Sequence, residues 1–106
     1  MKDGAYQYTV EMTVPRGIRN GSLDIAIHSG AVTGNLTMFT NTQPIFQGIY
    51  AGSGISFIGE MRTMTSVISY TAEGTISPTR LKLVFHTEHG DYPAIGGQAI
   101  IDPRRA

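Results

Sequence analysis

Apolar and polar residues alternate one by one along most of this 106-residue chain. Near its start, Tyr8 and Val10 fall on one side of an extended strand and Thr9 falls on the other. The same period of two recurs in residues 22–28 and 81–86, whereas no window of about 11 residues carries a helical stripe. This pattern is typical of half-buried β-strands and predicts an all-β protein.

Turn-forming residues interrupt the alternation at intervals of about 12 residues, which is the spacing of a β-meander. The seven clusters are residues 15–17, 29–30, 41–43, 52–54, 64–66, 77–79 and 88–90. They leave eight strands, which we interpret as four consecutive hairpins in one domain spanning residues 1–106. The pair Asn20-Gly21 is interpreted as further turn chemistry.

Eight sequential antiparallel strands predict a closed up-and-down β-barrel, because pairing the last strand with the first leaves no exposed edge. Glycines inside the expected strands support closure, since they relieve crowding and permit strong coiling. They are Gly34, Gly48, Gly59, Gly74 and Gly97. The alternative architecture is a two-sheet β-sandwich.

We expect the apolar faces to fill the interior, because burying each larger apolar side chain contributes about 1.5–3 kcal/mol. The residues expected to line the lumen, and to bind any ligand there, are Tyr6, Tyr8, Met12, Met38, Tyr50, Phe57, Met61, Tyr70 and Phe85. A polar set is expected on the outer wall, namely Glu11, Asp24, Gln47, Glu60, Arg62, Glu73, His86 and Gln98. Within that set, we predict cross-strand pairs among Glu60, Arg62 and Glu73.

The composition argues against several classes of partner and site. Eight Lys and Arg balance eight Asp and Glu, so no general field favours nucleic acid or an anionic membrane as a partner. The lack of Cys excludes disulfides, thiolate metal sites and Cys nucleophiles. Residues 1–4 carry no apolar run, which favours a cytoplasmic location. We expect no cofactor.

The string His86-Thr87-Glu88-His89 carries residue types that bind metals. A zinc motif of this kind requires a helix, in which residues three or four apart share a face. At the end of a strand the two imidazoles diverge or enter the turn. We therefore expect no metal site here.

Three of the expected strands are apolar on both faces. Ile45, Phe46 and Ile49 show this pattern, as do the runs 55–58 and 94–101. A strand that is apolar on both sides implies cover on both sides. Because no helix is available for that cover, we expect a homo-oligomer formed through the outer wall of these strands.

Short motifs at the two ends of the chain suggest a family. Gly4-Ala5-Tyr6 stands at the start of the first strand, where lipocalins carry Gly-x-Trp, and Arg104 and Arg105 follow the last strand. With its strand count and order, the whole chain resembles the calycins, meaning avidin-like and lipocalin-like barrels. The chain is also similar to small bacterial barrels with repeated Thr-turn-Gly hairpins. The resemblance implies a small ligand in the lumen, although the lack of Trp argues against biotin.

Three functions are compatible with these observations. The leading hypothesis is a barrel that binds a small apolar or aromatic molecule in its lumen, where small residues expected on inward faces, such as Gly97 and Ala99, leave room. One alternative is a structural or oligomerisation module with a filled core. Another is a lumen-confining enzyme of the isomerase or cyclase kind, in which tyrosines such as Tyr70, with His86, are the available acids and bases. No residue is assigned a catalytic role.

Overall fold

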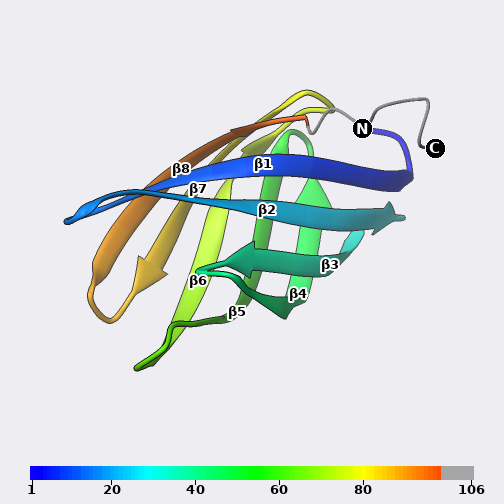
Figure 1. Cartoon of the computed structure of the whole chain (residues 1–106). Coiled ribbons are helices and arrows are strands. Elements are labelled where there is room, and N and C mark those ends of the chain that lie inside the picture. The colour runs from blue at the N-terminus through cyan, green and yellow to red at the C-terminus, as the bar shows by residue number, and fades with distance from the viewer. Residues whose placement is uncertain (99–106) are drawn as a thin grey trace, which may run out of the picture.

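The computed structural model describes residues 1–98, which form eight β-strands and no helix (Figure 1). In chain order the strands are β1 (Gly4–Val14), β2 (Gly17–His28), β3 (Ala31–Met38), β4 (Asn41–Ala51), β5 (Gly54–Arg62), β6 (Val67–Ile76), β7 (Arg80–Thr87) and β8 (Gly90–Gly97). Each strand pairs antiparallel with the next, and β8 pairs with β1. The predicted all-β architecture, a closed eight-stranded meander, is therefore confirmed.

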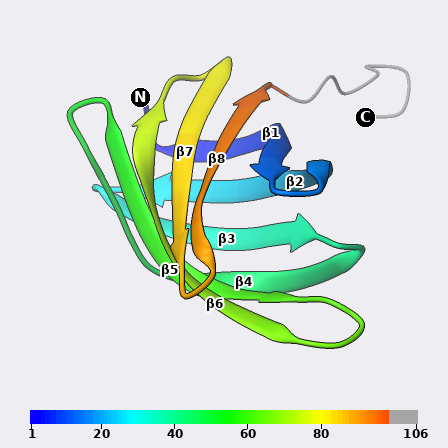
Figure 2. The ribbon, with the colours of Figure 1, turned by 90° about the vertical axis from the view of Figure 1, so that its left-hand side faces the viewer.

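The barrel is flattened into two crossing layers. Its principal extents are 36 × 32 × 19 Å, and in Figure 2 β2 and β3 run across the view while β7 and β8 run steeply. Packed sheets in proteins lie about 10 Å apart, a gap that interdigitating side chains fill. The sheet is thus closed like a barrel, while its strands run in two crossing directions.

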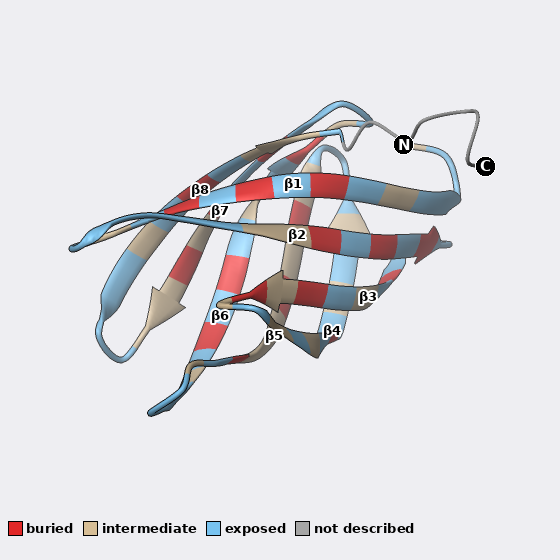
Figure 3. Ribbon diagram, viewed as in Figure 1, coloured by how far each residue is buried: buried red, intermediate tan, exposed pale blue. Residues whose placement is uncertain are grey.

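Alternate residues of most strands point into the interior, which gives the banding of buried and exposed positions in Figure 3. Twenty apolar side chains, each at most 6 % exposed, form one core. Within it, Phe57, Tyr70 and Phe85 pack edge to face, with ring centroids 5.1 to 6.4 Å apart. No charged or amide side chain of residues 1–98 is buried, so the outward placement predicted for the polar set is confirmed.

Strand β4 contains a β-bulge that changes which of its residues face the interior. Its register against β5 shifts between Phe46 and Ile49, and Gln47 within that interval has a φ of 52°. Ile45 is buried before the bulge, and Tyr50 packs against the core after it. Phe46 and Ile49 consequently both face outward. The bulge explains why the sequence of β4 is apolar on both faces.

Two predictions about turns are wrong. The pair Asn20-Gly21 lies inside β2, whose pairing with β1 is uninterrupted there. The third turn consists of Phe39 and Thr40, not residues 41–43, and both of its residues have a positive φ, 56° and 58°. Such a turn normally contains Gly, Asn or Asp. Because this one contains none of them, the sequence carries no signal for its position.

One prediction about inward glycines is also wrong. Gly96 pairs with the buried Leu81, and Gly97 pairs with the exposed Arg80. Because neighbouring residues of a strand point to opposite faces, the inward residue is Gly96 and Gly97 faces outward. The predictions that concern Ala99, the end of the run 94–101, and Arg104 and Arg105 lie outside the described residues.

Candidate functional site

Three tyrosines of the predicted lumen set lie at the end of the barrel near the N-terminus, and their hydroxyls are all hydrogen-bonded. The amino group of Met1 donates to the Tyr50 hydroxyl at 2.8 Å, and the Tyr6 hydroxyl donates to a carbonyl of the N-terminal segment. The Tyr8 hydroxyl donates to the Ser77 carbonyl oxygen at 2.7 Å. Burial, with the neighbouring Tyr6 and Tyr50, raises the pKa of Tyr8 to about 12. These hydroxyls fasten the chain across one end of the barrel.

Tyr70, on β6, differs from these three tyrosines. Its side chain is 4 % exposed, and its hydroxyl has no hydrogen-bond partner within residues 1–98. The phenol lies over Gly59, its ladder partner on β5, so closely that a methyl group on Gly59 would touch the hydroxyl. Burial raises the pKa of Tyr70, which keeps the hydroxyl protonated. Among residues 1–98, the interior therefore contains one side-chain hydrogen-bond donor without an acceptor.

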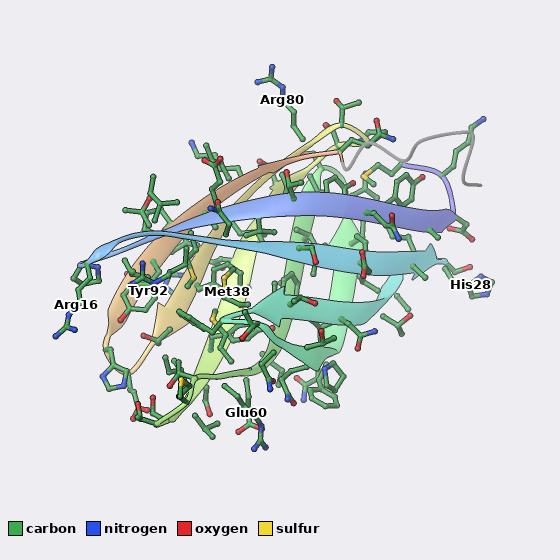
Figure 4. All side chains as sticks on the ribbon, in the orientation of Figure 1. Arg16, His28, Met38, Glu60, Arg80 and Tyr92 are labelled. Atoms are coloured by element: carbon green, nitrogen blue, oxygen red, sulfur yellow. The ribbon has the colours of Figure 1, made fainter. Side chains whose placement is uncertain are left out.

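The other residues of the predicted lumen set pack into the core. Met12, Met38, Phe57, Met61 and Phe85 are at most 3 % exposed. In Figure 4, Met38 points into the barrel, whereas the labelled side chains Arg16, His28, Glu60 and Arg80 project outward. The structure thus brings the predicted set together, with Tyr6 and Tyr50 partly buried at its edge. Its role in ligand binding stays a prediction.

His86, on the outer wall of β7, lies between two carboxylates. Its Nδ1 is 2.8 Å from Asp91 Oδ1 on β8, and its Nε2 is 3.1 Å from Glu73 Oε1 on β6. The hydrogen bonds to Asp91 and then to Glu73 raise the pKa of His86. The imidazole links three neighbouring strands on the surface. Because Tyr70 is buried inside the barrel, these two groups do not face a common substrate position.

This arrangement corrects one prediction about charged residues. Glu73 pairs with His86 and not with Arg62, whose guanidinium lies 4.0 Å from Glu60 on the same strand. His89 contacts the glutamate that precedes it, at 3.7 Å. Among residues 1–98, no three His, Asp or Glu side chains are arranged to hold a metal ion.

The outer wall of β4 and β5 carries an apolar ridge between two hollows. The ridge, hereafter the β4 ridge, consists of Phe46 and Ile49, which are 53 % and 58 % exposed. One hollow, of about 540 Å³, has Ile49, Ser56, Thr75 and Val84 in its lining. The other, of about 360 Å³, has Phe46, Ile58, Ser69 and Thr71 in its lining. Apolar and hydroxyl groups share this face with Glu73, in the lining of the first hollow, and Glu60, in the lining of the second.

A third hollow, hereafter the seam groove, has a volume of about 910 Å³ and lies over the seam where β8 meets β1. Its lining includes Thr9, Glu11, Arg80, Lys82, Gly96 and Gly97. Within residues 1–98, Ala94 and Ile95 of β8 pair with β1 in the ladder, and Gln98 adds one isolated bridge. All three hollows open to the outside of the barrel.

Sequence reasoning found the residues of the β4 ridge but missed the seam groove. The groove joins residues from the two ends of the described chain, and they become neighbours only when the barrel closes. The available signal was the pair Gly96-Gly97, of which Gly97 leaves β8 without a side chain beside Arg80.

In the part of the chain that the structure describes, no helix has the length and apolar character needed to cross a membrane. Comparisons of the chain with protein-family models, with curated proteins and with solved structures gave no match.

Proposed function

We propose that this protein is an assembly module, a β-barrel with a filled core that pairs with a second copy of itself through the outer wall of β4 and β5. The observation that carries the proposal is the exposure of the β4 ridge, where the bulge at Gln47 turns both Phe46 and Ile49 outward. Large apolar side chains grouped on an exposed wall mark interaction surfaces.

The shape of this face suits pairing with an identical copy. The β4 ridge stands between hollows of about 540 Å³ and 360 Å³. A two-fold dimer uses the same patch on both subunits. The ridge of one copy can therefore enter a hollow of its partner and receive the partner's ridge in return. The partly buried side chains of Ile58 and Val84 supply apolar contacts inside the hollows.

Charges around the β4 ridge are arranged so that they do not oppose pairing. Glu60 lies 4.0 Å from Arg62, and Glu73 lies 3.1 Å from His86. Both carboxylates line the hollows, and each has a neighbouring basic group, which limits repulsion between two copies. By contrast, the outer face of β3 has no charged residue, because it carries Ala31, Thr33, Asn35 and Thr37.

The filled interior also supports an assembly role over a container role. Twenty apolar side chains occupy the core, and the molecule is only 19 Å across its thinnest dimension. Close-packed side chains in a core stabilise the fold and leave few voids larger than a water molecule. The outer wall is then the surface with which the barrel acts.

The proposal is tested by light scattering coupled to size-exclusion chromatography. We expect the unmodified chain to elute at twice the 11.4 kDa of one chain, and the double variant Phe46→Ser/Ile49→Thr to elute at the single-chain mass. The matched control is Ile95→Thr, which removes a 58 % exposed apolar side chain from β8 and should leave the dimer intact. A dimer that survives the double variant, or that only Ile95→Thr disrupts, contradicts the proposal.

A second candidate function is the binding of a small apolar or aromatic molecule in the lumen, as in a calycin-like barrel. The buried Tyr70 hydroxyl, which has no partner in the described part of the chain, favours it, since an acceptor on a ligand would satisfy that donor. Native mass spectrometry of the purified protein tests this candidate. It predicts a bound compound in the unmodified chain that Tyr70→Phe retains less well. If the two proteins retain the compound equally well, this candidate is contradicted.

A further inference from the structure

We propose that the seam groove is a binding site for a small anionic molecule that also carries hydroxyl groups, of about the size of a sugar phosphate. The groove lies on the wall formed by β1, β8 and β7, so the proposal does not depend on self-association. Its volume of about 910 Å³ is within the ~300–1,000 Å³ typical of small-molecule sites.

The floor of the groove is main chain, because β8 carries no side chain at this point. Gly97 lies between Arg80, its ladder partner on β7, and Thr9 of β1. The Thr9 hydroxyl donates to the Gly97 carbonyl oxygen at 3.3 Å. Gly96 adds main chain to the lining, and the next outward residue of β8 is Ile95. A ligand can therefore approach the backbone closely between two polar side chains, as glycine positions allow.

The β7 side of the groove carries its positive charge. Arg80 and Lys82 are two residues apart on one strand, so both side chains project from the outer face, and both are exposed. Their ladder partners on β8 are Gly97 and Ile95, which bear no charge. Within residues 1–98, neither cation forms an ion pair. A guanidinium in this position can bind a phosphate or carboxylate through two parallel hydrogen bonds.

The opposite side of the groove sets the orientation of the ligand. Glu11 of β1 lies across the seam from Ile95, so it repels an anion and accepts hydrogen bonds from ligand hydroxyls. The anionic group is then placed at the Arg80 end. Thr79 adds a hydroxyl at that end. The Arg80 backbone N–H donates to the Ser77 hydroxyl at 3.1 Å, which fixes the turn that presents Arg80.

Amide NMR of the full chain, titrated with glucose 6-phosphate, tests the proposal. We expect saturable shifts at the amides of Thr9, Gly96, Gly97 and Arg80. The double variant Arg80→Gln/Lys82→Gln should weaken binding by about tenfold or more, because it removes the charge-assisted hydrogen bonds. The control is Arg62→Gln, which removes an exposed Arg from β5 on another part of the wall and should leave the affinity unchanged.

Two further probes measure separately how much the anionic group and the hydroxyl groups of the ligand contribute to binding. Inorganic phosphate should shift the same amides with weaker affinity, and glucose, which lacks the anion, should shift them least. The proposal is overturned if shifts scatter over the whole surface, if glucose binds as well as its phosphate, or if the double variant binds as well as the unmodified chain.

Discussion

At the residue scale, Tyr8 and Tyr70 are two buried tyrosines whose hydroxyls differ in their surroundings. Tyr8 donates to the Ser77 carbonyl oxygen at 2.7 Å, whereas Tyr70 has no partner within the described part of the chain. A buried polar group left unsatisfied costs about 1–3 kcal/mol, and a satisfied hydrogen bond contributes about 1 kcal/mol. Removing these two oxygens should therefore change stability in opposite directions.

We expect Tyr70→Phe to raise the free energy of unfolding by about 1 kcal/mol, because it removes a buried donor that has no acceptor within residues 1–98. Tyr8→Phe, which deletes the same atom at a satisfied position, should lower it by about 1 kcal/mol. Urea denaturation of the two variants measures both changes. If both substitutions destabilise the barrel equally, the Tyr70 hydroxyl has an acceptor and the description of its site is wrong.

His86 provides a pH-dependent prediction at the same scale. Its hydrogen bonds to Asp91 and then Glu73 raise its folded-state pKa above the ordinary 6.5. The folded chain then holds this proton more tightly than the unfolded chain does. The resulting stabilisation is fully present below the unfolded pKa of about 6.5 and is lost as the pH rises through the folded pKa.

The measurement is urea denaturation of the unmodified chain and of His86→Gln over that pH range. The stability difference between them should be largest in acid and shrink as the pH rises. Asp91→Asn, which removes the closer carboxylate, should reduce this pH dependence without abolishing it. An identical pH profile for the unmodified chain and His86→Gln would show that the two carboxylates do not act on His86 in solution.

At the scale of the strand, the bulge in β4 decides what the outer wall presents. Gln47 has a φ of 52°, a conformation that costs a residue with a Cβ about 1–2 kcal/mol. We expect Gln47→Gly to raise the free energy of unfolding by about 1 kcal/mol. Gln7→Gly, at an exposed position inside β1, should lower it by about 0.5–1 kcal/mol. If Gln47→Gly destabilises as Gln7→Gly does, the bulge is not where the structure places it.

The seam between β8 and β1 gives a second prediction about strands. A methyl group on Gly96 would overlap the Thr9 carbonyl oxygen, whereas the nearest atom to one on Gly97 is 3.7 Å away. Thermal and urea denaturation should show that Gly96→Ala destabilises the barrel by about 1–3 kcal/mol, as overpacked sites do. Gly97→Ala should be nearly neutral. The reverse order would contradict the inward placement of Gly96.

Much of this architecture was predictable because a meander needs only local information. Alternation at residues such as Tyr8 and Val10 identifies the inward face of each strand, and even turn spacing gives the strand number. The extra residue at Gln47 was not predicted, since one inserted residue reverses the facing of all that follow, and the neighbouring Gly48 was interpreted as a sign of strand coiling. The adjacent Gly96 and Gly97 were ambiguous for a similar reason, because a one-residue shift exchanges their roles.

At the scale of the whole molecule, the sequence predicted which residues face the interior. It did not predict whether they fill the barrel or leave room for a ligand. Whether side chains fill a barrel depends on how far its walls approach one another, and no short sequence pattern encodes that distance. Here the molecule is flattened to 19 Å, and the predicted lumen set forms part of its core. The exposed β4 ridge and the seam groove are therefore the surfaces on which we base function.

The most direct test of the central claim, that this barrel assembles through its outer wall, is sedimentation equilibrium of the unmodified full chain over a dilution series. The account predicts a reversible equilibrium between one chain of 11.4 kDa and a species of twice that mass, which dissociates on dilution. A mass of 11.4 kDa at every concentration, or growth to ever larger species, would contradict it.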